Sequence, residues 1–259
     1  MINSLWISKS GMSAQQTQLD VISHNLANVS TTGYKRASAV FQDLMYQNQR
    51  QVGASTSEQS QLPTGLHLGL GVNTVSTSRD FRQGTPQASG KDFDIAINGS
   101  GFFQIDMPDG TIAYTRDGTF SPDATGQLVN ASGNPLSGGI TVPPSTAKMS
   151  VSDQGLIEFF DKAGTKLGGA NLTLASFVNP GGLEPIGQNM FRESVASGNP
   201  QTGAPDSNGL GKTLQGFLEG SNVNVVEELV TMIQTQRAYE MNSKAITTSD
   251  QMLAKLAQL

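Results

Sequence analysis

The sequence predicts an α+β protein in which long N- and C-terminal helices form a coiled-coil core domain, with a central antiparallel β-rich domain and an extended linker arm. All 11 prolines of the 259-residue chain lie between Pro63 and Pro205, and no glycine follows Gly220. Because proline and glycine break helices and build turns, both chain ends can form long helices, whereas the middle must form short elements. Apolar residues also recur every seven positions near both ends, as they do in coiled coils.

The predicted organisation has three parts. Residues 1–35 and 221–259 form the terminal helical coiled-coil domain, residues 36–70 the extended linker or arm, and residues 71–220 the β-rich domain. The arm is rich in glutamine and serine, a composition typical of linkers. Its end carries four closely spaced leucines that we expect to be buried against neighbouring subunits: Leu62, Leu66, Leu68 and Leu70. The alternative is that the arm is a solvated tether.

The N-terminal helix is expected to begin at a cap formed by Asn3 or Ser4 and to end near Asn28. The glycine that follows, Gly33, suits a left-handed turn after the helix. One apolar residue stands at every seventh position of this helix: Leu5, Met12, Leu19 and Leu26.

The C-terminal helix is expected to begin after Asn224, because Asn224 and Glu227 have the spacing of a capping box. It carries a second heptad row: Val225, Met232, Tyr239, Ile246 and Leu253. We expect the two heptad rows to form an assembly interface, in which the helices pack on each other or on copies of themselves. The alternative is a two-helix satellite that packs on the core of its own chain.

The middle of the chain carries the signals of short antiparallel strands. Strands are expected at 93–97, 101–105, 112–115, 156–160 and 171–178. The dipeptide Asp-Gly at 109–110 fits a two-residue hairpin turn, and the residues at 161–164 fit a second hairpin. Turn signals that recur at this short spacing favour an antiparallel sandwich or barrel over βαβ units.

The composition excludes several classes of function. A net charge of −5 argues against a nucleic-acid partner, and no apolar run is long enough for a transmembrane segment. We expect no cleaved signal peptide, since the N-terminus lacks a basic region followed by an apolar one. There is no cysteine, and the two histidines, His24 and His67, lie far apart in sequence. The sequence therefore predicts no catalytic residue, no cofactor and no metal site.

Four acidic residues invite a calcium or glycosidase interpretation: Asp106, Asp109, Asp117 and Asp123. Each lies in or beside a predicted turn, where aspartate accepts local backbone hydrogen bonds. We therefore expect these carboxylates to stabilise turns.

The stretch 10–36 strongly resembles the N-terminal signature of bacterial flagellar rod and hook proteins. The residues of this sequence that carry the family motif are Asn25, Leu26, Ala27, Asn28, Gly33 and Tyr34. His24 stands where the family more often has asparagine. Residues 102–103, 114–120 and 126–129 resemble the β-domain signature of the family, and residues 219–230 and 236–240 resemble its C-terminal signature.

The resemblance implies a self-assembling subunit of the flagellar basal body. Length and the segment 62–72 are similar to the distal-rod branch of the family, with a proximal-rod paralogue as the alternative. The implied role is a helical homopolymer that forms a hollow drive shaft in the periplasm, exported by the flagellar type III apparatus. The implied partners are proximal rod subunits, hook subunits and the surrounding ring (bushing) proteins. A secreted β-rich domain that binds or hydrolyses glycan is the alternative from a different class.

Overall fold

The computed structural model describes residues 2–50, 55–57, 60–61 and 64–256. The chain folds into two compact units. We call residues 1–26, 37–78 and 224–259 the helical unit, and residues 27–36 and 79–223 the β unit. The predicted mixture of terminal helices and a central β-rich region is confirmed.

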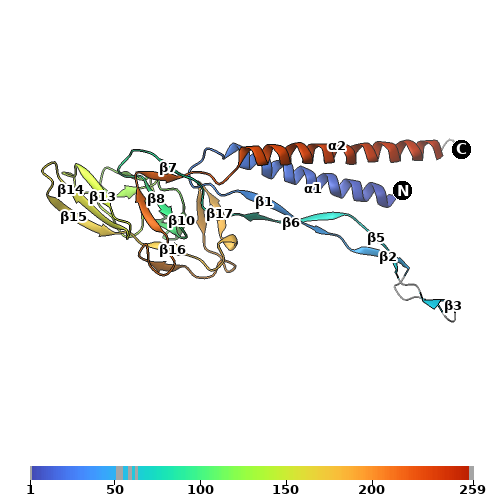
Figure 1. Cartoon of the computed structure of the whole chain (residues 1–259), viewed down its shortest axis with the longest axis horizontal. Coiled ribbons are helices and arrows are strands. Elements are labelled where there is room, and N and C mark those ends of the chain that lie inside the picture. The colour runs from blue at the N-terminus through green and yellow to red at the C-terminus, as the bar shows by residue number, and fades with distance from the viewer. Residues whose placement is uncertain (1, 51–54, 58–59, 62–63, 257–259) are drawn as a thin grey trace. The chain divides into compact units, whose positions relative to one another are not determined.

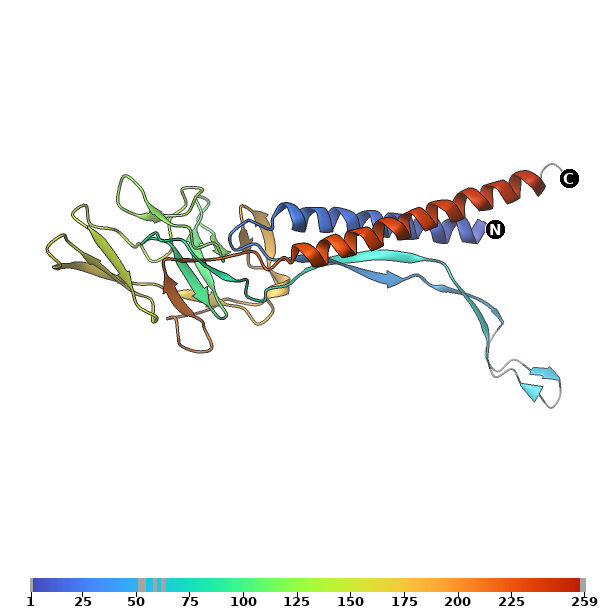
Figure 2. The ribbon, with the colours of Figure 1, turned by 45° about the horizontal axis from the view of Figure 1, so that its top comes forward.

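The two helices of the helical unit are α1 (Ile2–Ala27) and α2 (Val225–Leu256). They lie side by side and run in opposite directions, α1 in blue and α2 in red (Figures 1 and 2). The side chain of Asn224 accepts a hydrogen bond from the backbone N–H of Val226 at 3.1 Å, which confirms the predicted cap. The predicted caps of α1, Asn3 and Ser4, instead lie inside its first turn. Neither helix carries, in its described residues, a stretch apolar enough to cross a membrane.

The segment expected as an arm supplies five of the six described strands of a long antiparallel ribbon. Its strand pairs are β1 (Ala37–Asp43) with β6 (Val72–Arg79), β2 (Tyr46–Arg50) with β5 (Leu66–Gly69), and β3 (Ser55–Ser57) with β4 (Ser60–Gln61). Tyr46 pairs with Gly69 in the register of the ribbon. The ribbon is attached to α1 through Ser10, whose hydroxyl accepts the N–H of Val72 at 3.3 Å. Leu66, Leu68 and Leu70 are exposed, and Leu62 lies outside the described residues.

The largest sheet of the β unit has six antiparallel strands in the order β17-β18-β10-β9-β16-β19. Their bounds are β9 (Phe102–Asp106), β10 (Ile112–Thr115), β16 (Leu174–Ser176), β17 (Glu184–Gly187), β18 (Met190–Arg192) and β19 (Gln201–Gly203). A short 3₁₀ helix, η1 (Pro180–Gly182), precedes β17. The other elements are β7 (Pro86–Ala88), β8 (Ile95–Asn98), β11 (Ser121–Pro122), β12 (Leu128–Val129), β13 (Lys148–Val151), β14 (Leu156–Phe160), β15 (Lys166–Asn171), β20 (Lys212–Gln215) and β21 (Phe217–Glu219).

The predicted hairpins exist, with different details. β9 and β10 form a hairpin, but Met107 and Thr111 close its loop, which is therefore longer than a two-residue turn. β14 pairs with β15, as expected from the turn at 161–164. β8 and β9 are consecutive but do not pair, because β8 pairs with β20 from the far end of the unit. The strand expected at 171–178 is shorter and spans only β16.

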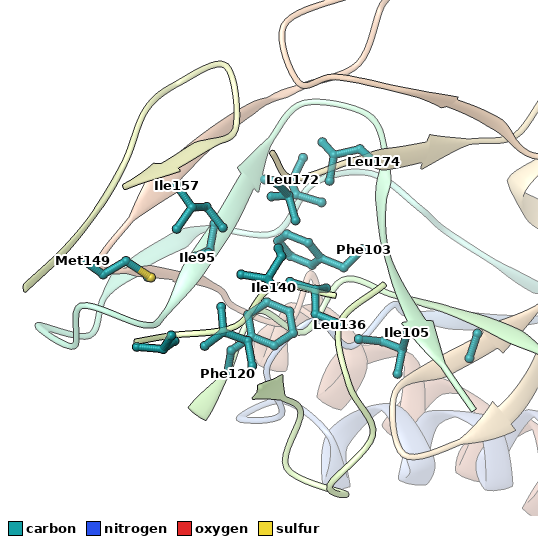
Figure 3. Close-up of a cluster of buried hydrophobic side chains, with 14 of the residues drawn as sticks. Ile95, Phe103, Ile105, Phe120, Leu136, Ile140, Met149, Ile157, Leu172 and Leu174 are labelled. Atoms are coloured by element: carbon teal, nitrogen blue, oxygen red, sulfur yellow. The ribbon is translucent and has the colours of Figure 1, made fainter. Parts of the chain in front are cut away.

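The core of the β unit lies between these sheets. Figure 3 labels ten of its side chains, which converge from β8, β9, β13, β14, β16 and neighbouring loops. Several are less than 1% exposed: Ile95, Phe103, Ile105, Ile157 and Leu174. A second cluster is aromatic, and in it the rings of Tyr114 and Phe177 meet edge to face with centroids 4.8 Å apart.

Candidate assembly surfaces and the base of the helices

The predicted heptad residues of α1 and α2 are not fully buried within one chain. Seven are half-buried: Leu5, Met12, Leu19, Leu26, Met232, Ile246 and Leu253. Val225 and Tyr239 remain 38% and 37% exposed. Since burying an apolar side chain stabilises roughly in proportion to the area removed from water, these rows contribute only part of their potential in a single copy.

Small and polar residues fill the seam between the helices instead. Among the described helix residues of the helical unit, the buried ones are Ala14, Ile22, Asn25, Glu228, Thr235 and Ser249, of which only Ile22 has a large apolar side chain. Across the seam, the amide of Asn242 donates to Oε1 of Gln15 at 3.1 Å, and a Cβ on Gly11 would lie only 3.0 Å from Nδ2 of Asn242. The helices therefore approach closely, but their contact buries little apolar surface.

A second apolar row on α2 faces solvent. Val226, Leu229, Val230 and Ile233 follow the i, i+3, i+4, i+7 pattern of one helix face and are 42% to 69% exposed. At 100° per residue this face lies roughly opposite the seam position Thr235. Sequence reasoning followed only the seven-residue period and missed this row, although the run 225–233 contains the signal.

An apolar groove of about 410 Å³ lies in the helical unit, between α1, α2 and the ribbon. Its walls include Ala14, Gln18, Phe41, Val72 and Ala238. The carbonyl oxygen of the Gln18 side chain is buried there without a hydrogen-bond partner among the described residues. The helical unit thus offers both an exposed apolar row and an apolar groove for contacts outside the chain.

The motif residue Asn25 joins three segments of the helical unit. Its side-chain amide donates to the carbonyl of Ala37 at 2.8 Å and to Oε2 of Glu228 at 3.4 Å. Its side-chain oxygen accepts the N–H of Ala37 at 2.9 Å. Asn25 therefore holds the last turn of α1 to the start of β1 and to the first turn of α2. The next motif residues are less enclosed, since Leu26 is half-buried and Ala27 is exposed.

The rest of the motif forms a turn in the β unit. The backbone carbonyl of Asn28 accepts the N–H of Thr31, and the side-chain oxygen of Asn28 accepts the Thr31 hydroxyl. Gly33, which follows, adopts a φ of 67°. A Cβ on Gly33 would lie 2.6 Å from the backbone nitrogen of Asp117, so only glycine fits. Tyr34 is buried, and the guanidinium of Arg79 lies 6.0 Å from the centre of its ring.

A buried ion cluster follows the motif. Nζ of Lys35 lies 2.5 Å from Oε1 of Glu219, and a guanidinium nitrogen of Arg116 lies 3.3 Å from Oε2 of the same carboxylate. All three side chains are at least 96% buried. Burial lowers the pKa of Lys35 and of Arg116, and the Glu219 charge partly opposes both shifts. Sequence reasoning gave no role to this cluster, whose members are far apart in the chain.

Three of the four acidic residues act in turns as the sequence predicted, whereas Asp106 is the last residue of β9. Asp109, Asp117 and Asp123 each accept the N–H and the hydroxyl of the threonine two residues later. The hydrogen bonds from these threonines lower the pKa of Asp109 and of Asp123. Within the described ranges, no three acidic, histidine or cysteine side chains come together as a metal site would require.

Comparisons with known proteins agree with this architecture. Three family models match: "Flagella basal body rod protein" at residues 5–35, "Flagellar hook protein FlgE/F/G D1 domain" at 96–159, and "Flagellar basal body rod FlgEFG protein C-terminal" at 214–259.

Several curated relatives are named "Flagellar basal-body rod protein FlgG". The one from Buchnera aphidicola (Schizaphis graminum) is 54% identical over 100% of both chains. The one from Borreliella burgdorferi is 43% identical over 98% of this chain and 97% of its own, and the one from Bacillus subtilis 37% over 100% and 99%. At this identity over the full length, the chain belongs to the flagellar basal-body rod protein family.

Proposed function

We propose that this chain is the structural subunit of the flagellar distal rod, in which copies assemble helically into the hollow shaft that transmits torque from motor to hook. Its relatives named FlgG support this role over that of a proximal-rod paralogue or a glycan-acting secreted domain. The partners are then other copies, proximal rod subunits, hook subunits and the ring proteins around the rod. The subunit is then exported through the flagellar type III apparatus, and the rod lies in the periplasm.

The observation that carries this proposal is the solvent-exposed apolar row Val226, Leu229, Val230 and Ile233 on α2. Four large aliphatic side chains on one helix face are costly in water and gain free energy when another surface covers them. Contacts between different surfaces of identical copies generate open helical polymers. We therefore assign this row to packing between copies.

The heptad rows complete this packing as the coiled-coil core of the rod. Each residue of the predicted interface, from Leu5 to Leu26 and from Val225 to Leu253, retains exposed area that a neighbouring helix would remove from water. The polar seam holds the two helices of one copy in register, and the apolar residues beside it bind other copies. Many weak contacts of this kind become strong when a polymer repeats them.

The test compares two aspartate substitutions on α2. Ile233→Asp places a charge in the proposed interface, whereas Ser243→Asp places the same charge at an exposed polar position of the same helix. We expect Ile233→Asp to abolish rods in electron micrographs while the circular dichroism of the monomer is unchanged. Ser243→Asp should assemble like the parent. Rods of normal yield from Ile233→Asp would contradict the proposal.

A further inference from the structure

One half-buried arginine of the β unit has no counter-ion in its own chain. Arg79, the last residue of β6, is half-buried, yet its guanidinium makes no hydrogen bond or ion pair with any described residue. Other arginines of the unit are paired, Arg116 with Glu219 and Arg192 with Glu184. A guanidinium carries five N–H donors in one plane, and a donor that is shielded from water without a partner costs free energy. An anion bound to Arg79 would remove that cost.

Two buried aromatic rings hold this guanidinium in place. Its central carbon lies 5.5 Å from the centre of the Phe191 ring and 6.0 Å from that of Tyr34, at the distance of a cation–π interaction. The two rings are 3% and 5% exposed, and Phe191 is fixed by its strand pairing with Tyr114 and by an edge-to-face contact with Phe81. A side chain that is already ordered loses little entropy when a partner binds. Arg79 is therefore a preorganised receptor for an anion.

The segments around Arg79 carry an excess of positive charge. The carbonyl of Arg36 accepts the N–H of Asp80 at 2.9 Å, which brings residues 35–36 beside residues 79–82. Together these six residues include four basic side chains and one acidic one. That acid, Asp80, is already used by Arg82, whose backbone N–H and Nε–H it accepts at 3.0 and 2.7 Å. The site therefore attracts a further negative charge.

The chemistry of the site selects a carboxylate from another protein surface. A guanidinium binds carboxylate or phosphate through two parallel hydrogen bonds. A phosphate polymer or an anionic membrane would be disfavoured by the net charge of −5 on the whole chain. A second copy, in contrast, supplies carboxylates in surplus, with 21 acidic residues against 16 lysines and arginines. Charge complementarity therefore favours another copy of this chain as the partner.

We propose that, in the assembled polymer, Arg79 binds a carboxylate of a neighbouring copy of this chain. The contact joins two different surfaces of identical copies, as a helical polymer requires. This inference rests on the proposed function, because it needs copies to assemble. It adds a contact that depends on charge and is made by the β unit to the apolar packing of the helices.

A zero-length cross-linker tests the contact and identifies the carboxylate. Arg79→Lys keeps the positive charge and supplies an amine, which a carbodiimide joins to a touching carboxylate as an amide while the carbodiimide takes up the water as a urea. In rods isolated from cells that make this full-length variant, we expect mass spectrometry to find the introduced lysine joined to an aspartate or glutamate. The product should occur in the covalent dimer and be absent from treated dilute monomer. Arg82→Lys is the matched control, because its introduced amine lies beside Asp80 of its own chain and should give no such dimer.

The outcomes separate this inference from the proposed function. Rods in which the lysine introduced at position 79 reacts only within its own chain, with a different protein, or not at all would overturn the inference and leave the proposed function standing. A parent chain that forms no rods would overturn both.

Charge removal gives a second, independent readout. Arg79→Met covers the same two rings with an apolar side chain, so the Tm of the monomer should stay within about 2 °C of the parent. The protein concentration needed for assembly should rise about ten-fold or more, and Arg79→Lys should lie between this variant and the parent. Loss of rods at an unchanged Tm would support the contact. Normal assembly of Arg79→Met, whatever its Tm, would show instead that Arg79 serves only the fold of its own chain.

Discussion

The two units of this protein distribute their apolar side chains in opposite ways. The β unit encloses them, with Phe103, Ile157 and Leu174 almost completely removed from water. The helical unit leaves Trp6, Ile233 and Met241 more than half exposed and buries polar side chains in its seam. The difference teaches that the β unit completes its core within one copy, whereas the helical unit is built to complete its core with others.

Buried polar groups follow the same division. In the β unit, Glu219 holds two buried cations and also accepts the N–H of Gly84 at 2.9 Å. In the helical unit, a buried polar contact joins the two helices, since the side-chain amide of Asn25 donates to the carboxylate of Glu228. We therefore expect substitutions inside the β unit to lower monomer stability and substitutions on the helices to lower assembly.

The largest loss of unfolding free energy should come from neutralising the carboxylate of Glu219 in the ion cluster. Glu219→Gln leaves Lys35 and Arg116 buried without a counter-charge, which should cost about 3–5 kcal/mol of unfolding free energy. Lys35→Met should cost much less, because it leaves one cation with one anion. Urea unfolding followed by circular dichroism measures both. Equal losses would show that charge balance does not govern the cluster.

A smaller loss of unfolding free energy should distinguish the core of the β unit from the packing of the helical unit. Leu174→Ala in the β unit should lower the unfolding free energy by about 2–5 kcal/mol, because it leaves a cavity among fully buried side chains. Leu19→Ala in α1 removes the same atoms from a half-buried site and should cost the monomer about 1 kcal/mol. Urea unfolding of both variants measures this, and assembly should rank them in the reverse order. A helical variant as unstable as the β variant would break the contrast between the units.

The sequence predicts those features of the fold that local signals encode. The cap at Asn224, the extents of both helices and the hairpin between β14 and β15 all follow from residues close together in the chain. The pairing of β8 with β20, and of β1 with β6, does not, because those strands are far apart in sequence and many registers satisfy the same apolar pattern.

For the candidate sites, too, the sequence predicts local features but not contacts between distant residues. The motif at Asn25 was found by resemblance, but its partners Ala37 and Glu228 become visible only in the folded chain. Glu219 resembles any surface glutamate until Lys35 is brought against it, and Arg79 resembles any surface arginine until its place on two buried aromatic rings is seen. Burial, which decides the role of each of these side chains, is a property of the whole fold.

The smallest effect should appear at the start of α2. Because the helical unit buries little apolar surface, its helices depend more on local interactions than a helix in a packed core does. Asn224→Ala removes the acceptor of the Val226 N–H and should cost about 1 kcal/mol, seen as lower helical ellipticity of the monomer. Ser243→Ala, at an exposed position within α2, is the control and should leave ellipticity equal or higher. Unchanged ellipticity in Asn224→Ala would mean that tertiary packing alone holds α2, and the contrast between the two units would then be weaker than the burial pattern indicates.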